Sequence, residues 1–141
     1  MLTLRAATLA DAALLLAWRN DPVTLAASFT SGEVTADEHE AWLTRRLADP
    51  SCQLWIAEQA GAPVGQARID ADGEISISID SAARGRGLAA QVIELACRAA
   101  TAPIIVARVK SDNQASLRAF VAAGFEQVRA SAESVELQRA Q

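Results

Sequence analysis

Isoleucine alternates with serine or aspartate between Glu74 and Asp80, so that every second residue is apolar. A period of two is typical of a strand with one buried face. From Leu88 to Ala99 the spacing changes, and apolar residues recur as they do on the buried side of a helix. The pattern therefore predicts a strand and then a helix, joined by a glycine-rich turn. The inward positions of that helix should be Leu88, Val92, Leu95, Ala96 and Ala99.

The turn between them reads Arg84-Gly85-Arg86-Gly87-Leu88-Ala89. Glycine allows bare backbone to approach a ligand closely. The first N–H groups of the following helix are unpaired and lie at the positive end of the helix dipole. Together these properties predict an anion site suited to a phosphate or pyrophosphate, to which the two arginines add positive charge.

The same patterns predict further strands at residues 2–6, 54–58, 64–69, 104–109, 125–129 and 134–137. The strands between residues 54 and 80 should form an antiparallel meander, because Gly61-Ala62-Pro63 and Asp72-Gly73 supply tight turns. Residues 104–109 are nearly all apolar, which favours a buried parallel strand after the crossover helix. The last two strands should form a closing hairpin.

Capping residues mark the other helices. Thr8 with Asp11 precedes an apolar helix that ends near Trp18, and Thr35 with Glu38 forms a capping box that opens a helix to about residue 49. Another helix spans residues 113–123 before a glycine cap, and residues 23–34 suggest a short helix and a loop. Inward side chains of the helices at 35–49 and 113–123 should be Trp42, Leu43, Leu47, Leu117, Phe120 and Val121.

Composition narrows the class of protein. The chain has 141 residues and 51 % are hydrophobic, so we expect one folded domain spanning residues 1–141. A net charge of −4 argues against nucleic acid or an anionic membrane as the main partner. The sequence shows no signal peptide or transmembrane segment, and Cys52 and Cys97 are expected to be reduced core residues, which favours the cytoplasm.

Three interpretations of the glycine turn compete when its residues are taken alone. Gly85-x-Gly87-x-x-Ala90 fits the dinucleotide fingerprint, but that motif needs a doubly wound parallel sheet, and antiparallel strands precede it here. A triphosphate-binding loop is excluded, because no Gly-Lys-Ser/Thr follows. The plain alternative is a turn that only joins a strand to a helix.

A second motif changes this balance. Arg84-x-x-Gly87-x-Ala89, taken with Asn113-x-x-Ser116-x-x-x-Phe120-x-x-x-Gly124-Phe125, resembles the GNAT superfamily of acyl-CoA-dependent N-acyltransferases. The first motif is similar to its pyrophosphate loop, and the second to its later cofactor-contacting helix and Gly-Phe turn. The resemblance extends over the whole predicted order of elements. It implies a mixed α/β fold with a mostly antiparallel sheet, and a cleft where the strand from Glu74 and the strand from Ile104 splay apart.

The resemblance implies acetyl-CoA as the cosubstrate and no metal. The pantetheine arm would pair with the backbone of Ile77, Ser78 and Ile79 as an added strand. The pyrophosphate would lie on the N–H groups of the turn. Asn113 and Phe120 are expected to contact the cofactor or shape its cleft. The residues expected at the pyrophosphate are Arg84, Gly85, Arg86, Gly87, Leu88 and Ala89.

Catalysis requires a neutral amine, a polarised thioester and a leaving thiol. Glu74 resembles the acidic residue that begins this strand in relatives, and we expect it to act as the base; the alternative is a solvated carboxylate at a strand start. A backbone N–H near Ile77 or Ser78 would hold the oxyanion. Many family members place a tyrosine at the position of Phe120 as general acid. Here either Ser116 replaces it or the thiolate leaves unaided.

The expected acceptor is a small primary amine. Trp18-Arg19-Asn20-Asp21 resembles the tetrapeptide that closes the first helix in GNAT enzymes acetylating nucleotide-linked amino sugars, notably in pseudaminic-acid synthesis. Glu38-His39-x-x-Trp42 and Val109-Lys110-x-x-Asn113 support the same branch.

Within these motifs, Arg19 and Asn20 are the expected acceptor contacts, Trp18 a core residue, and His39 a residue of an exposed helix face. The alternatives are acetylation of a protein N-terminus and a non-catalytic acyl-CoA-binding module. A homodimer is expected.

Overall fold

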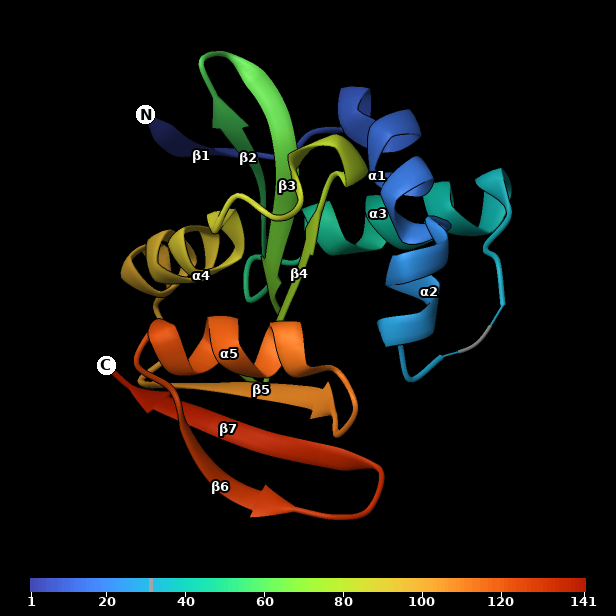
Figure 1. Ribbon diagram of the computed structural model, residues 1–141. Helices are drawn as coiled ribbons and strands as arrows, with labels where there is room; N and C mark the ends of the chain where they lie inside the picture. Colours follow the sequence, from blue (N-terminus) through green and yellow to red (C-terminus); the bar gives the residue numbers. More distant parts are fainter. Residues whose placement is uncertain (31) are drawn as a thin grey trace.

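The computed structural model describes residues 1–30 and 32–141 (Figure 1). The expectation for residues 23–34 includes residue 31, which lies outside the described residues. The strands are β1 (Leu2–Ala6), β2 (Gln53–Gln59), β3 (Ala62–Ile69), β4 (Ile75–Ile79), β5 (Ile104–Lys110), β6 (Glu126–Ala130) and β7 (Ser134–Ala140). The helices are η1 (Leu9–Asp11), α1 (Ala12–Arg19), α2 (Pro22–Ala27), α3 (Ala36–Ala48), η2 (Ser81–Ala83), α4 (Leu88–Ala99) and α5 (Gln114–Ala122).

The strands form two antiparallel sheets that meet at one point. The first sheet has the order β1-β2-β3-β4 and the second the order β5-β7-β6. A parallel bridge between Glu74 and Val106 joins them, and the Val106 N–H donates to the Gly73 carbonyl at 3.0 Å. Beyond this junction β4 and β5 run in different directions (Figure 1). The expected mixed α/β fold with a mostly antiparallel sheet and splayed strands is confirmed.

The prediction of a buried parallel strand at residues 104–109 is confirmed only in part. β5 pairs antiparallel with β7, and its parallel contact with the other sheet is the bridge at Val106. Burial alternates along β5, with Ile105 fully buried and Ile104 47 % exposed. The apolar run is therefore half-buried, because α5 and the core cover one face of the second sheet. The closing hairpin is confirmed, although β7 continues to Ala140.

Helices cover both faces of the first sheet. α4 packs against β1, β3 and β4 on one face, and α1 and α3 lie on the other (Figure 1). The larger core is built around Val92, Ile93, Ile105 and Leu137, and the smaller one around Leu15, Leu43 and Ile56.

Three residues predicted to face inward are exposed: Leu47 at 37 %, Val121 at 59 %, and Ala99. They lie near the ends of α3, α5 and α4, where the helices extend past the surface that they cover. Among the described residues, no helix is long and apolar enough to cross a membrane.

Candidate active site

The glycine turn has the backbone conformation that its sequence predicts. Gly85 and Gly87 have φ values of 77° and 71°, in the left-handed region that other residues rarely adopt. Gly87 is the N-cap residue of α4, and its cap has no side-chain hydrogen bond. A Cβ added at either glycine would meet no atom within 4 Å. The positive φ, not crowding, therefore requires glycine here, and the turn is open to a ligand.

The side chains around the turn divide into two groups. Leu88 is buried and Ala89 is half-buried, so these residues offer their N–H groups and not their side chains. Arg86 is exposed. Arg84 is held in place, because its Nη2 donates to Asp21 Oδ1 at 2.8 Å.

The register of β4 gives its two backbone edges different roles. Asp80 N–H donates to Val64 O at 2.8 Å, and Asp70 N–H donates to Glu74 O at 3.0 Å, so the even-numbered residues of β4 bond toward β3. The backbone groups of Ile77 and Ile79 consequently face the open edge beside β5. The backbone groups of Ser78, in contrast, bond to β3. An added strand on this edge would pair with the two isoleucines.

The side chains of β4 also alternate, with the isoleucines on one face of the sheet and the serines on the other. Ile77 and Ile79 pack against the larger core, beneath α4. Ser78 points to the other face, where its Oγ accepts a hydrogen bond from Gln66 Nε2 at 3.1 Å. β4 therefore presents its open backbone edge toward β5, and its serine side chains on the face of the sheet opposite α4.

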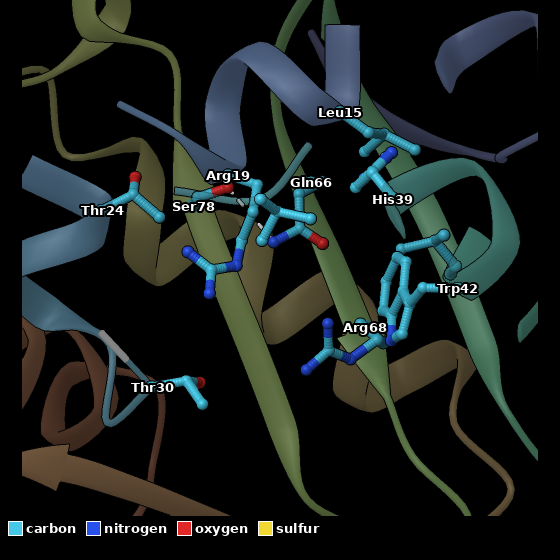
Figure 2. Close-up of a pocket in the computed structure, with 11 residues that line it drawn as sticks. Leu15, Arg19, Thr24, Thr30, His39, Trp42, Gln66, Arg68 and Ser78 are labelled. Carbon is cyan, nitrogen blue, oxygen red and sulfur yellow. Dashed lines mark hydrogen bonds between the residues drawn. The ribbon is translucent and has the colours of Figure 1, made fainter. Parts of the chain in front are cut away.

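A cavity of about 320 Å³ lies on this second face, a volume within the usual range for small-molecule sites. Its floor is formed by Leu54, Gln66, Arg68 and Ser78 of the first sheet. α1 supplies Leu15 and Arg19, and α3 supplies His39 and Trp42. Thr24 of α2, with Thr30 and Val34 of the following segment, completes the lining (Figure 2).

Arg68 is fixed by several contacts. Its guanidinium lies 5.1 Å from the Trp42 ring centroid, and its Nη2 donates to Ser76 Oγ at 3.3 Å. Its Nε lies 3.1 Å from Asp70 Oδ1, an ion-pair distance, although the N–H is not directed well enough for a hydrogen bond. Burial lowers the pKa of Arg68, with the charge of Asp70 acting in the opposite direction. A guanidinium remains charged at neutral pH despite this.

His39 lies in the cavity, and the prediction of an exposed helix face is wrong. Its residue surface is 5 % exposed, and its ring lies 5.6 Å from that of Trp42. Burial lowers the pKa of His39, and the neighbouring Arg19 charge adds to this effect. His39 is therefore neutral at neutral pH. The polar spacing of α3 suggested a solvent face, because the sequence gives no sign that α1 and the sheet enclose the start of this helix.

Glu74 stands at the junction of the two sheets. It precedes β4 on the same face as Ser76 and Ser78, but it is not among the residues that line the cavity. Its Oε1 lies 3.5 Å from Arg108 Nη1. Burial raises the pKa of Glu74, and the charge of Arg108 opposes that shift. A carboxylate with a raised pKa is a better proton acceptor than an exposed one.

The remaining expected site residues have identifiable contacts. Asn20 uses its amide on the backbone of Val34, with both hydrogen bonds at 2.8 Å, and this fixes the segment that closes the cavity. Asn113 caps α5 by accepting from the Ser116 N–H at 3.2 Å. Ser116 is half-buried. Phe120 is 4 % exposed and packs edge-on against Phe125. Trp18 is confirmed as a core residue, 5 % exposed.

Gln66 and Arg68 of β3 line the cavity but were not predicted as site residues from the sequence. A signal was available, because both alternate with buried residues on a strand inside a sheet that carries helices on both faces. Polar side chains that point under a helix are costly unless they are bonded or line a site. Within residues 1–30 and 32–141, no cluster of three or more His, Cys, Asp or Glu side chains suits a metal.

Comparison with known proteins identifies the family. Residues 1–126 match the family model described as an acetyltransferase (GNAT) domain, so the chain belongs to this family. A search of curated protein sequences gave no match. The GNAT expectation from the sequence is thereby confirmed, and with it acetyl-CoA as the cosubstrate.

Solved structures show the same fold. Spermidine N-acetyltransferase from Vibrio cholerae, in complex with CoA and spermine, has a TM-score of 0.87 and 19 % identity, over 99 % of this chain and 95 % of that one. Aminoglycoside acetyltransferase AAC(6')-Ib, in complex with coenzyme A and kanamycin, has a TM-score of 0.82 and 20 % identity, over 100 % and 95 %. A domain from Methanocaldococcus jannaschii has a TM-score of 0.84 and 20 % identity, over 100 % and 99 %. The branch that acetylates nucleotide-linked amino sugars is not among these neighbours.

Proposed function

We propose that this member of the GNAT family transfers the acetyl group of acetyl-CoA to a primary amine of a small molecule. The observation that carries the proposal is the position of β4. Its open backbone edge leads to the glycine turn, and Ser78 on its polar face lines the cavity. A donor on the edge and an acceptor in the cavity would meet across a single strand.

On the donor side, the backbone of Ile77 and Ile79 supports pairing with an extended pantetheine arm. Gly87 and the first N–H groups of α4 support binding of the pyrophosphate. The Ile77 N–H is a better oxyanion donor than the Ser78 N–H, because the backbone of Ser78 bonds toward β3. Asn113 and Phe120 remain proposed cofactor contacts through their place on α5.

In the reaction, the neutral amine nitrogen attacks the thioester carbon, a C–N bond forms and the C–S bond breaks. The amine proton passes to a base, for which we propose Glu74, directly or through water. The leaving thiolate takes its proton from Ser116 or from solvent, since a thiol pKa near about 8.5 makes it a fair leaving group. His39, neutral and inside the cavity, is available to hold the amine by hydrogen bonding.

Acceptor identity is the finer part of the proposal. The sequence favours a nucleotide-linked amino sugar, and Arg19 in the cavity gives its phosphates a partner. Arg19 and Asn20 are proposed to position the acceptor, Arg19 by contact and Asn20 by fixing Val34. We further propose a homodimer in the cytoplasm, which light scattering and cell fractionation would test.

The direct test measures CoA release with a panel of primary amines. We expect release above the uncatalysed rate with at least one small amine, and a one-to-one yield of the N-acetyl product by mass spectrometry. Acetyl-CoA binding by calorimetry with no release for any amine would instead establish a non-catalytic acyl-CoA-binding module. Release only with peptides that have a free N-terminus would establish the protein N-terminal activity.

A further inference from the structure

Among the described residues, the cavity that we assign to the acceptor is lined by two arginines and by no carboxylate. Arg19 extends into it from α1 and Arg68 from β3 (Figure 2). The other polar lining residues are neutral: two threonines, a serine, a glutamine and a histidine whose pKa is lowered. Among the described residues that line it, none supplies a negative charge to receive an ammonium group.

Arg19 has a buried hydrogen-bond donor for which the described residues supply no acceptor. Its Nη1 is buried and has no hydrogen-bond partner in the described part of the chain. Within residues 1–30 and 32–141 it also makes no ion pair. A buried donor without an acceptor is costly, and such groups are usually satisfied by a partner or mark a functional site. A ligand oxygen in the cavity would satisfy this one.

Arg68 is held in place but its charge is only partly balanced. Stacking on Trp42 and the hydrogen bond to Ser76 orient its guanidinium. Asp70 is its nearest carboxylate, but the same oxygen, Oδ1, also bonds Arg46 Nη1 at 2.7 Å. One carboxylate therefore serves two guanidinium groups. A fixed guanidinium with spare donors is well suited to a carboxylate or phosphate.

We propose that the acceptor carries a carboxylate or phosphate group in addition to its amine, and that Arg19 and Arg68 bind this group. The inference rests on the proposed function and narrows its substrate class. It separates this chain from the structural neighbours crystallised with spermine and kanamycin, because additional ammonium groups would lie against the two guanidinium groups. The anion would hold the molecule while its amine lies toward Ser78 and the open edge of β4.

The test compares amines that differ only in the anion. Glucosamine 6-phosphate is paired with glucosamine, and β-alanine with β-alaninamide; the second compound of each pair, which lacks the anion, is its neutral member. Both compounds of a pair are compared at the same concentration of unprotonated amine. Spermidine and kanamycin complete the panel. We expect kcat/KM for the anionic member of at least one pair to exceed that of its neutral partner by about 100-fold, since charged hydrogen bonds are lost in the partner. The preferred pair distinguishes phosphate from carboxylate.

Variants assign the preference to the two arginines. Arg19→Gln and Arg68→Gln should each reduce kcat/KM for the anionic member by about 10–100-fold, and the ratio of kcat/KM between the anionic and the neutral member should fall by a similar factor. Arg19→Lys should recover part of the loss, because charge is restored without the fork of donors. Arg45→Gln is the matched control, since Arg45 is exposed on α3 and does not line the cavity. Circular dichroism confirms folding of each variant.

A binding measurement distinguishes a failure of the anion site from a failure of acetyl transfer. Calorimetry with saturating CoA should show glucosamine 6-phosphate or β-alanine binding to the wild type and binding more weakly to Arg19→Gln. If such binding occurs without CoA release for any amine, the anion site stands and the transferase proposal fails. If CoA is released with spermidine, kanamycin or the neutral members as fast as with their anionic partners, the anion inference is overturned and the transferase proposal stands.

Discussion

Arg84 Nη2 donates to Asp21 Oδ1 at 2.8 Å, and this ion pair ties the start of the glycine turn to the N-cap residue of α2. The same Asp21 oxygen accepts from the Val23 N–H at 3.0 Å, and so caps α2. Hydrogen bonding by Arg84 lowers the pKa of Asp21, so the carboxylate is charged at neutral pH. The ion pair therefore links the proposed donor site to α2, whose Thr24 lines the proposed acceptor site.

Asp21→Asn should raise the KM for the acceptor and change CoA affinity by less than about twofold. Asparagine retains the helix cap, whereas the loss of the charge frees α2, which carries Thr24 into the cavity. Steady-state kinetics and calorimetry provide the two readouts.

Arg84→Gln is the companion variant: it should raise the same KM and also weaken CoA, because it removes a charge beside the turn. An unchanged acceptor KM in both variants would show that the ion pair has no influence on the cavity.

Gly87→Ala should weaken CoA binding by about tenfold or more, because a methyl group would occupy the surface on which the pyrophosphate is proposed to lie. The backbone cost of a positive φ should also reduce the free energy of unfolding by about 1–2 kcal/mol.

Gly61→Ala isolates that backbone cost. Gly61 has a φ of 80°, also has no neighbour within 4 Å of an added Cβ, and lies in the β2–β3 turn away from α4. It should lose similar stability in urea denaturation and retain CoA affinity. Equal affinities of both variants in calorimetry would place the pyrophosphate elsewhere.

Glu74→Gln should lower turnover by about 10²–10⁴. In the wild type, burial raises the pKa of Glu74 above its ordinary value of 4.5, so kcat/KM should fall with decreasing pH below a midpoint higher than 4.5. The variant should lose this limb of the profile.

Glu136→Gln is the control for that measurement, because Glu136 Oε1 contacts the same Arg108 at 3.7 Å from the second sheet. Similar losses in both variants would mean that Glu74 acts only through Arg108.

His39 is the only histidine, so its imidazole signals in an NMR titration are unambiguous. We expect a midpoint below 6.5, because burial disfavours the charged ring and Arg19 repels it. The folded chain then binds fewer protons here than the unfolded chain, so this contribution to stability is full above about pH 6.5 and is lost as the pH falls through the folded pKa.

His39→Gln should lack that loss of stability, measured by urea denaturation at pH 7.5 and pH 5. A wild-type midpoint at or above 6.5 would contradict the buried, neutral ring.

Much of the donor side was predictable because it depends on local chemistry. The alternation in β4, the glycines at positive φ and the cap at Asn113 are each determined by residues close in sequence. The acceptor side depends on which distant elements pack together. His39 and Arg68 lie 29 positions apart, and only the placement of α3 over β3 brings both into one cavity.

The second sheet shows the same limit. Residues 104–109 have the composition of a buried parallel strand, but they pair antiparallel with β7, and only one face of the resulting sheet is buried. Pairing between segments so far apart in sequence leaves little trace in either segment alone.

Phe120 has no hydroxyl, so it cannot act as the general acid. Combining Ser116→Ala with Phe120→Tyr tests whether Ser116 has that role. If Ser116 protonates the leaving thiolate, Ser116→Ala should lower turnover by about 10²-fold. Phe120→Tyr in the same chain should then restore part of it, because the tyrosine supplies a hydroxyl from α5. As a single substitution, Phe120→Tyr should reduce the free energy of unfolding by about 1–3 kcal/mol, since Phe120 is 4 % exposed and packs against Phe125.

Rates of thiol release from the wild type, the single variants and the double variant separate the two routes for the thiolate. Asn113 caps α5 through the backbone N–H of Ser116 and not its hydroxyl, so Ser116→Ala leaves that cap intact and tests the hydroxyl alone. Full turnover in Ser116→Ala, with no gain from tyrosine, would show that the thiolate leaves unaided. Loss in Ser116→Ala with recovery in the double variant would establish that a hydroxyl on this helix delivers the proton.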